Sequence, residues 1–300
     1  MSNDTGAIKN SLVDFNVLIL TFVFRALEDV SLGPDETKGD KWRGALGYSL
    51  KRETCRAQYP KDCPTCQLKA DCTYFMYFLN DKPHPYILRP KLDTKPVYAK
   101  GEEITLELVL IGNAIVRSHA FIAALINAGK KGMGKGRARL LSETLEITQR
   151  FDFNDLLGCE LMNTNRITIE LITPMKLKDN NGAINYGEFT FTAFFKALMM
   201  RIRNLSNLYC AGKASDRKAI DGEIQDLLSM SDSVNCQHST KWQDYKRYSS
   251  RQKSTMKIGG LIGSVKLDGD LDVFYPYLKI GEILGTGQYT SSGFGRYKLL

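Results

Sequence analysis

The first half of the chain alternates between apolar runs typical of strands and the 3.6-residue periodicity typical of helices. Residues 12–26 are rich in Leu, Val, Ile and Phe and predict a long strand. Gly33, Pro34 and Gly39 are expected to break the chain after this strand. Asp40 is a helix-capping residue type, and the helix that it predicts runs to about Arg52. A proline-rich passage over 83–96 follows and is expected to be largely extended or looped. After it we expect a strand over 103–111, a helix over 120–128 and a strand over 139–148. The first half is therefore interpreted as strand, helix, strand, strand, helix, strand.

The second half repeats this order with one insertion. Residues 167–172 predict a strand that ends before Pro174, and an apolar stripe with helical spacing follows. The stripe is interpreted as core, and its members are Phe191, Phe194, Phe195, Leu198, Met199, Ile202, Leu205 and Leu208. The expected elements after it are a polar inserted helix over 216–230, a basic hairpin over 242–266, a helix over 274–284 and a glycine-rich last strand.

Both halves end on a short basic glycine-rich segment. The first reads Gly132-Met133-Gly134-Lys135-Gly136-Arg137, and the second reads Gly293-Phe294-Gly295-Arg296. A duplicated β-α-β-β-α-β unit explains this likeness most simply. We therefore predict an α+β protein of two tandem domains over residues 1–155 and 156–300, with the boundary between Phe151 and Asn165.

Composition narrows the classes of function. The 300 residues are 43% hydrophobic and 25% charged, which is typical of a globular chain. Lys and Arg total 41 against 33 Asp and Glu, and the resulting charge of +8 favours a polyanionic partner. The most apolar segment, 12–27, contains Asp14 and Arg25 and is shorter than the ~20 residues of a membrane span. Without a basic leader or a small-residue cleavage site, the protein is expected in the cytoplasm, with no membrane partner.

The first glycine loop resembles a nucleotide-binding loop only in part. Gly129 to Lys135 matches GxxxxGK, but Gly136 stands where a magnesium-binding Ser or Thr is needed, and the loop joins a helix to a strand. Five cations and no acid between residues 130 and 139 instead favour a phosphate chain. A solvated, flexible turn is the alternative.

The chain ends on Gly285-Thr286-Gly287-Gln288-Tyr289-Thr290-Ser291-Ser292-Gly293-Phe294-Gly295-Arg296-Tyr297. This ending resembles the glycine-rich signature of CRISPR repeat-processing endoribonucleases, in the RAMP superfamily. Similar positions continue through nearly the whole chain in order. They are Arg43-Gly44-Ala45-Leu46-Gly47, Cys72-Thr73-Tyr74, Thr173-Pro174, Trp242, Tyr245, Arg247, Tyr248, Ser249, Arg251, Gln252 and Gly259-Gly260-Leu261-Ile262-Gly263.

The resemblance implies two ferredoxin-like (RRM-like) domains that bind the repeat hairpin of precursor CRISPR RNA and cut it once. In that family no cofactor takes part in cleavage: the ribose 2′-hydroxyl attacks the adjacent phosphate and leaves a 2′,3′-cyclic phosphate. Such a reaction needs a base, an acid and cations around the developing charge. Other subunits of a CRISPR effector complex are further possible partners. Two alternatives are a non-catalytic RAMP subunit that only holds RNA and a zinc-containing RNA- or protein-binding module.

Candidate RNA-binding residues follow from cations interleaved with aromatic side chains, because unpaired bases stack on aromatic rings while cations hold the backbone. A solvated hairpin is the alternative for the stretch after Ser239. The residues expected to contact RNA are Lys135, Arg137, Arg247, Tyr248, Arg251, Lys253, Gly293, Gly295 and Arg296. Both glycine loops are expected to face the strand 1–helix 1 junction of their domain, which in the first half carries Lys41 and Arg43.

The catalytic base is where the chain departs from the family pattern, since many relatives place a histidine near the first helix and residues 31–54 contain none. His84, between two prolines, is interpreted as part of a rigid loop, and His119 as lying at the wrong sheet edge. His238 precedes the basic hairpin, where nearby cations favour the neutral imidazole that can accept the 2′-proton. We predict His238 as base, with Lys41 or Arg43 stabilising the phosphorane. A histidine-free site with Tyr48 or Tyr248 as a weak base is the alternative.

Four of the seven cysteines lie within residues 55–72. Cys63 and Cys66 form a CxxC pair, and Cys55 and Cys72 flank it, so that the four predict a closed four-sulfur zinc site. An iron–sulfur cluster and reduced cysteines packed in a loop are the alternatives.

Overall fold

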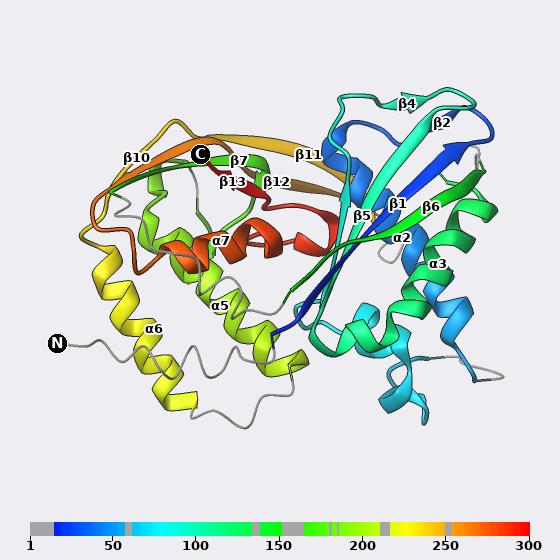
Figure 1. Cartoon of the computed structure of the whole chain (residues 1–300), viewed down its shortest axis with the longest axis horizontal. Coiled ribbons are helices and arrows are strands. Elements are labelled where there is room, and N and C mark those ends of the chain that lie inside the picture. The colour runs from blue at the N-terminus through cyan, green and yellow to red at the C-terminus, as the bar shows by residue number, and fades with distance from the viewer. Residues whose placement is uncertain are drawn as a thin grey trace. The chain divides into compact units, whose positions relative to one another are not determined.

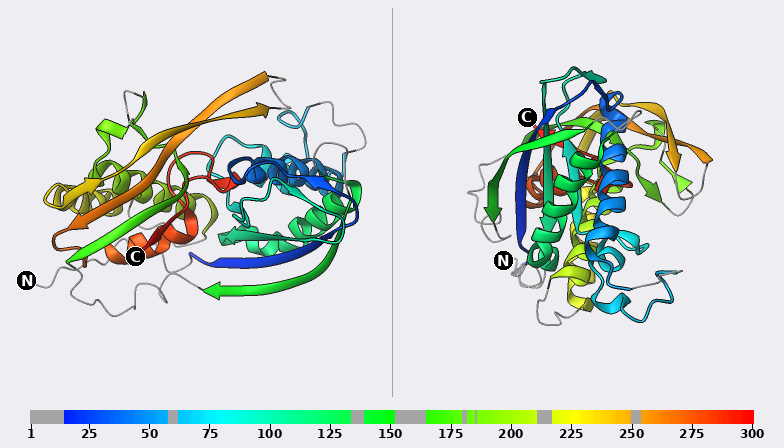
Figure 2. Two further views of the ribbon diagram at one scale, coloured as in Figure 1. Left: turned by 90° about the horizontal axis from the view of Figure 1, so that it is seen from above. Right: turned by 90° about the vertical axis from the view of Figure 1, so that its right-hand side faces the viewer.

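The computed structural model describes residues 15–57, 62–133, 139–151, 165–179, 182–184, 186–210, 217–249 and 254–300. The chain divides into two compact units. The N-terminal unit comprises Val17–Arg150, and the C-terminal unit comprises Phe151–Leu300 together with Phe15 and Asn16. Figures 1 and 2 show both.

The N-terminal unit has a four-stranded antiparallel sheet in the order β3-β5-β1-β6. Its elements are β1 (Val17–Ala26), β2 (Val30–Ser31), α2 (Asp35–Thr54), η1 (Lys69–Asp71), η2 (Phe75–Leu79), β3 (Tyr86–Pro90), β4 (Val97–Tyr98), β5 (Glu103–Ile111), η3 (Gly112–Arg117), α3 (Ser118–Lys131) and β6 (Leu140–Phe151). With β2 and β4 set aside as a separate small pair, the order is the ferredoxin-like β-α-β-β-α-β, as predicted.

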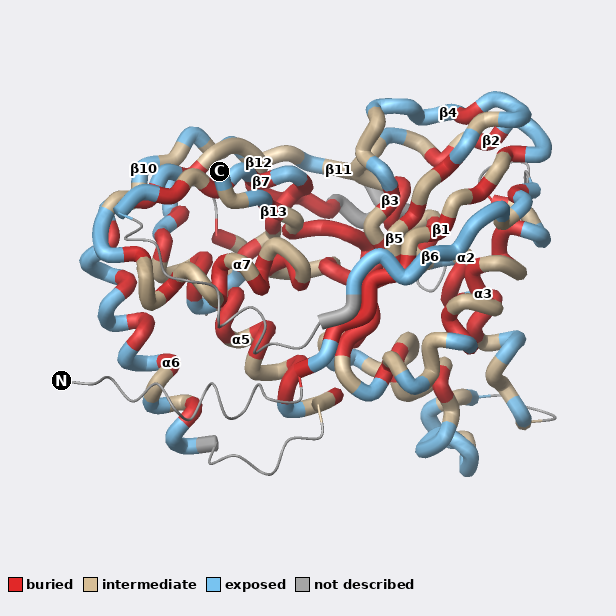
Figure 3. The backbone as a smooth tube through the Cα atoms, in the orientation of Figure 1, coloured by how far each residue is buried: buried red, intermediate tan, exposed pale blue. Residues whose placement is uncertain are grey.

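Period-two alternation in β1 explains why the two helices cover one face of this sheet. Phe22 and Phe24 are fully buried, and the Phe24 ring lies 5.1 Å from that of Trp42 on α2. α2 and α3 pack beside each other on that face (Figure 1). The edge strand β6 is largely exposed next to the buried β1 (Figure 3).

The predicted cap of the first helix is wrong. α2 begins at Asp35, with Pro34 at the N-cap, so that Asp40 lies inside the helix. Proline has the fixed φ that suits a helix start, and Asp35 and Glu36 place negative charge in the first turn, where the helix dipole favours it. Gly39, which the sequence pattern indicated as a breaker, is instead a buried residue of α2.

The C-terminal unit repeats the same order with strands β7, β10–β11, β12 and β13. Its elements are β7 (Arg166–Met175), β8 (Lys178–Asp179), β9 (Gly182–Ala183), η4 (Tyr186–Glu188), α5 (Phe191–Tyr209), α6 (Arg217–Ser231), β10 (Asn235–His238), β11 (Lys241–Ser249), β12 (Ser254–Asp268), α7 (Tyr275–Leu284), η5 (Thr290–Ser292) and β13 (Tyr297–Leu299). The sheet order β10-β12-β7-β13 confirms the duplicated ferredoxin-like unit.

β10 and β11 are one strand with a short interruption, because both pair with β12 in the same register. β12 pairs with β7 only from Leu261 onward, so residues 254–260 extend beyond β7 with β11 as their partner. Figure 2 shows this long hairpin, which is the predicted basic hairpin.

The predicted stripe on α5 forms the core of the C-terminal unit. Seven of its members, from Phe191 to Leu205, are buried, and only Leu208 is half-buried. Their rings pack edge-on, as in the 5.0 Å contact of Phe195 with Phe274. None of the helices within the described residues combines the length and hydropathy needed to cross a membrane.

Candidate functional site

Arg43 is held on α2 by an aromatic cluster. Its guanidinium carbon lies 4.7 Å from the centre of the Phe78 ring, and Nη2 lies 3.0 Å from Nε2 of His84. Because a guanidinium only donates, His84 Nε2 accepts this hydrogen bond. The His84 ring in turn stacks on Tyr86, 5.4 Å away. Arg43 is thus a positioned cation, and its partners include His84, for which the flanking prolines predicted a rigid loop.

Lys41 lies two residues earlier on the same helix, about half a turn away. Its Nζ donates to the carbonyl oxygen of Ser31 at 3.1 Å, across the turn that joins β2 to α2. Gly33 stands in this turn with φ +74°, a conformation that a side chain would strain. Because α2 begins at Asp35 and not at Asp40, Lys41 and Arg43 lie in its second and third turns, and their role as cations of the reaction stays a prediction.

His238 ends β10 in the C-terminal unit. It lies opposite the buried Val265, so its side chain projects to the helix-covered face of the sheet. Nδ1 lies 2.9 Å from Oγ1 of Thr240, and the ring is 5.3 Å from that of Phe189. In the tautomer in which Nδ1–H donates to Thr240, Nε2 is an acceptor, as a general base requires.

The C-terminal glycine-rich segment folds back on itself and on the end of β7. The N–H of Gly293 donates to the Thr290 carbonyl, and that of Gly295 donates to the Pro174 carbonyl, both at 2.9 Å. A Cβ at Gly295, where φ is +70°, would overlap the Thr286 carbonyl. These two glycines therefore have a structural role in the loop, and their contact with RNA stays a prediction.

Arg201 forms a hydrogen bond with the residue just before this segment. Its Nε donates to the carbonyl oxygen of Leu284, the last residue of α7, at 3.1 Å. Burial lowers the pKa of Arg201 to about 10, so it remains a cation at neutral pH. A cation at the C-terminus of a helix is favoured by the helix dipole.

The hairpin meets the glycine-rich segment through aromatic rings. Tyr245 on β11 lies edge-on to Phe294 at 6.3 Å. Trp242 lies over Gly259, where a Cβ would collide with the indole, and its Nε1 donates to Asp244 at 2.8 Å. The backbone of Arg247 and Tyr248 lies in β11, opposite Met256 and Thr255.

Four of the predicted RNA-binding residues lie outside the described residues. They are Lys135, Arg137, Arg251 and Lys253. The side chain of Arg296 is half-buried, and its backbone N–H donates to Oγ1 of Thr173 at 2.9 Å.

The four clustered cysteines carry free thiols and are half-buried. The N–H of Cys66 donates to the Cys63 carbonyl at 3.2 Å, so the CxxC pair forms a turn. Within the described part of the chain, however, no three His, Cys, Asp or Glu side chains are grouped as metal ligands. Zinc at Cys55, Cys63, Cys66 and Cys72 stays a prediction, which elemental analysis of the purified protein tests.

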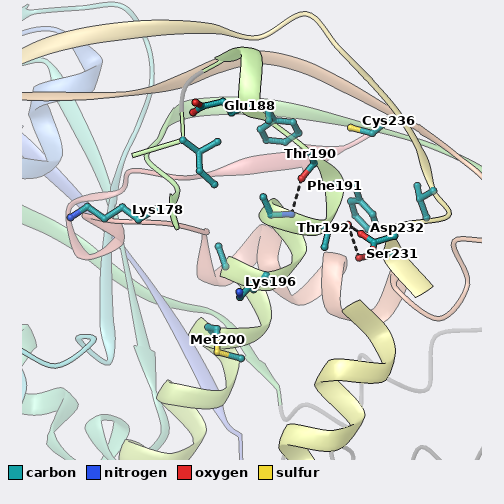
Figure 4. A pocket seen from close by; sticks show the side chains of 15 residues that line it. Lys178, Glu188, Thr190, Phe191, Thr192, Lys196, Met200, Ser231, Asp232 and Cys236 are labelled. Carbon is teal, nitrogen blue, oxygen red and sulfur yellow. Dashed lines mark hydrogen bonds between the residues drawn. The ribbon is translucent and has the colours of Figure 1, made fainter. Parts of the chain in front are cut away.

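A cavity of about 780 Å³ lies in the C-terminal unit between α5, the end of α6, β10 and the segment around η4 (Figure 4). Thr190 caps α5 at its rim by accepting from the Ala193 N–H at 3.1 Å. Lys178, Lys196, Glu188 and Asp232 give the cavity lining both signs of charge. None of the predicted site residues lines it.

Comparison with known families decides the identity. A family model described as CRISPR-associated endoribonuclease Cas6 matches residues 169–297. The model AF_1859_N, described as an N-terminal domain, matches residues 15–169. The chain is a CRISPR repeat-processing protein of the RAMP type, with a Cas6 domain over residues 169–297. Binding and processing of CRISPR repeat RNA is the function that this domain gives the chain. Among curated proteins, none matches it significantly.

Solved Cas6 structures share the fold along nearly the whole chain. The structure titled Cas6 (TTHB231) product complex is 14% identical, with a TM-score of 0.60, and 95% of this chain covers 99% of that one. Thermus thermophilus Cas6 (TTHB231) is 11% identical, with a TM-score of 0.55 and the same coverage. A partial Cas6-RT-Cas1–Cas2 complex is 11% identical, with a TM-score of 0.57, and 95% of this chain covers 46% of that one.

The pairing of Arg43 with His84 was missed because no local pattern joins them. The two residues are 41 positions apart, and the helix-to-strand connection between them includes the cysteine-rich segment. The one available signal was topological: the residue before the second strand of a ferredoxin-like unit returns beside the first helix. The two prolines around His84 obscured this signal by indicating a loop.

Proposed function

We propose that the chain cleaves CRISPR repeat RNA without a metal ion. The 2′-oxygen bonds to phosphorus, the bond from phosphorus to the 5′-oxygen breaks, and the products are a 2′,3′-cyclic phosphate and a 5′-hydroxyl. The base takes the 2′-proton, and an acid gives a proton to the leaving oxygen. The observation that carries the proposal is the Cas6 match over residues 169–297, in a sheet of the ferredoxin-like order.

We assign His238 as the base and Lys41 or Arg43 as the cation that stabilises the phosphorane. The hydrogen bond from Nδ1 to Thr240 supports His238, because it leaves Nε2 as acceptor in one tautomer. The contacts of Arg43 with Phe78 and His84 support its role, since a guanidinium that is already ordered loses less entropy on meeting the phosphate.

The direct test is incubation of end-labelled repeat RNA with the protein in excess EDTA. We expect one cut and a product that runs as a cyclic phosphate, which acid treatment opens to a monophosphate. RNA that is bound but uncut would favour the runner-up function, a non-catalytic RAMP subunit. The observation that favours this second function is that α2 contains no histidine. RNA that is neither bound nor cut would contradict both.

The RNA contacts predicted in the two basic segments have a salt signature. Arg137→Ala and Arg251→Ala should each remove one phosphate contact and flatten the slope of log affinity against log salt by about 0.7 to 0.9. Filter binding of catalytically inactive protein measures this slope over a roughly tenfold range of salt concentration, from about 50 to 500 mM. If both variants bind like the wild type across the range, these residues do not hold the RNA backbone.

Association with other CRISPR proteins is a further part of the proposal. One solved structure with the same fold is a partial Cas6-RT-Cas1–Cas2 complex. For this chain we propose that mature CRISPR RNA is handed to effector subunits after the cut.

A further inference from the structure

The exposed side of α2 carries an aromatic ring with two cations near it. Tyr48 lies within α2, and its side chain is 61% exposed. The guanidinium carbon of Arg52 lies 5.7 Å from the centre of the Tyr48 ring, and Nζ of Lys131, at the end of α3, lies 6.0 Å from it. Arg52 also donates from Nη1 to the Tyr48 hydroxyl at 3.1 Å.

Gly44 lies one turn before Tyr48 on the same side of α2. A Cβ at this position would meet no atom of the described residues within 4 Å, and the backbone has no positive φ. Glycine in the middle of a helix costs about 1 kcal/mol relative to alanine, and neither packing nor backbone conformation explains that cost here. The glycine leaves bare backbone beside the ring, which is a known use of glycine where a ligand approaches closely.

The open face of the N-terminal sheet is a poorer surface for a polyanion. Arg25 is paired with Glu143 at 2.5 Å and with Glu103 at 3.6 Å. Arg89 is paired with Glu107 at 3.6 Å. Each cation on this part of the sheet therefore has a carboxylate beside it, whereas Arg52 and Lys131 gather on an uncharged ring.

From these observations we infer that Gly44, Tyr48, Arg52 and Lys131 form a single-stranded RNA contact, the Tyr48 strip. An unpaired base of the repeat stacks on the Tyr48 ring, and the two cations hold its phosphates. Bases stack on aromatic side chains regardless of sequence, while arginine and lysine neutralise the backbone. This inference rests on the proposed function and adds to it a site for the unpaired part of the RNA.

The test compares Tyr48→Ala with Tyr48→Phe on two RNAs, the repeat stem-loop alone and the stem-loop with its single-stranded flanks. Loss of one stacked base should weaken binding of the flanked RNA by about tenfold in Tyr48→Ala. Tyr48→Phe keeps the ring and should bind like the wild type, and neither variant should change the affinity for the bare stem-loop.

A pair of glycine substitutions separates function from stability. Gly44→Gln and Gly222→Gln both replace an exposed helical glycine whose Cβ would meet no described atom within 4 Å, the second on α6. Both should raise Tm by about 1–3 °C through helix propensity. Only Gly44→Gln should weaken binding of the flanked RNA.

Three results would overturn the Tyr48 strip while the proposed function stands. They are wild-type affinity in Tyr48→Ala, wild-type affinity in Gly44→Gln, and equal loss of cleavage without loss of affinity in Tyr48→Ala and Tyr48→Phe. The last would make the hydroxyl a catalytic base instead. A wild-type protein that binds neither RNA would overturn the proposed function and the Tyr48 strip together.

Discussion

His238→Ala is expected to slow single-turnover cleavage of repeat RNA by about a hundredfold or more, with little change in affinity. A positioned general base contributes on the order of 10² to 10⁴ in rate. The imidazole lies half-buried between Phe189 and Thr240, so its removal leaves a gap but no unpaired charge. The measurement is quenched-flow or manual sampling with enzyme in excess over labelled RNA.

Gln237→Ala is the matched control for this experiment, because Gln237 is exposed and projects from β10 to the opposite face. It should cleave at the wild-type rate. A loss below about tenfold in His238→Ala would remove His238 as the base, since that is less than positioned proton transfer supplies. The histidine-free site with Tyr48 or Tyr248 would then be tested next.

Substitutions of His84 and His238 distinguish a residue that positions Arg43 from the proposed general base. His84 accepts from Arg43, so its loss should free the guanidinium to adopt other rotamers and reduce the rate through Arg43. Restoring a hydrogen-bond acceptor in His84→Gln should recover part of that rate. The same amide in His238→Gln should recover none, because an amide does not accept a proton at neutral pH.

The fold was predictable because hydrophobic periodicity reports burial directly. The stripe on α5 and the alternation in β5 both face the core, and each defines its element without reference to the rest of the chain. Helix boundaries were harder: Gly39 looked like a breaker because sequence alone does not show that its position is buried in α2. Tertiary packing overrides the intrinsic cost of that glycine.

The candidate site was less predictable because its contacts join distant segments. Lysines and arginines in the first three turns of α2 are equally consistent with solvation, ion pairing and RNA contact, and only the three-dimensional arrangement separates these roles. Lys41 bonds to a carbonyl, Arg43 to His84, and Lys38 to two carboxylates. Likewise, the glycine-rich segment suggested backbone N–H groups aimed at phosphate, whereas those of Gly293 and Gly295 donate inside the protein.

Lys38 is a cation of α2 that is fully buried and paired within the protein. The side chain is fully buried, and Nζ lies 2.6 Å from Asp35, 2.5 Å from Asp93 and 3.0 Å from the Tyr98 hydroxyl. Burial alone would lower the pKa of Lys38, but the hydrogen bonds to the two carboxylates and to Tyr98 outweigh it and raise the pKa well above its ordinary value. Burial likewise would raise the pKa of Asp93, and its hydrogen bonds from Lys38, the Lys95 backbone and Tyr98 lower it instead.

Lys38→Met should therefore destabilise the N-terminal unit by about 3 kcal/mol, because it leaves two half-buried carboxylates without their cation. The chain has two tryptophans, and Trp42 lies in this unit, so urea unfolding followed by fluorescence in a Trp242→Phe background reports on it. The control is Lys95→Met, which removes an exposed pair with Glu102 at 2.6 Å and should cost less than about 1 kcal/mol. Equal stability of Lys38→Met and Lys95→Met would contradict this prediction.

The pH dependence of the Lys38 effect has a definite sign. Because the pKa of Asp93 is lowered in the folded state, its contribution to stability is complete above its ordinary value of 3.8 and disappears as pH falls through the lowered value. Because the pKa of Lys38 is raised, its contribution is complete below its ordinary value of 10.5 and persists above it. The difference in unfolding free energy between the wild type and Lys38→Met should therefore be constant from about pH 5 to 10 and narrow below about pH 4, where protonated Asp93 no longer needs a cation. A difference that instead grows toward low pH would show that methionine disturbs the packing around Trp42 and that the ion pair is not the cause.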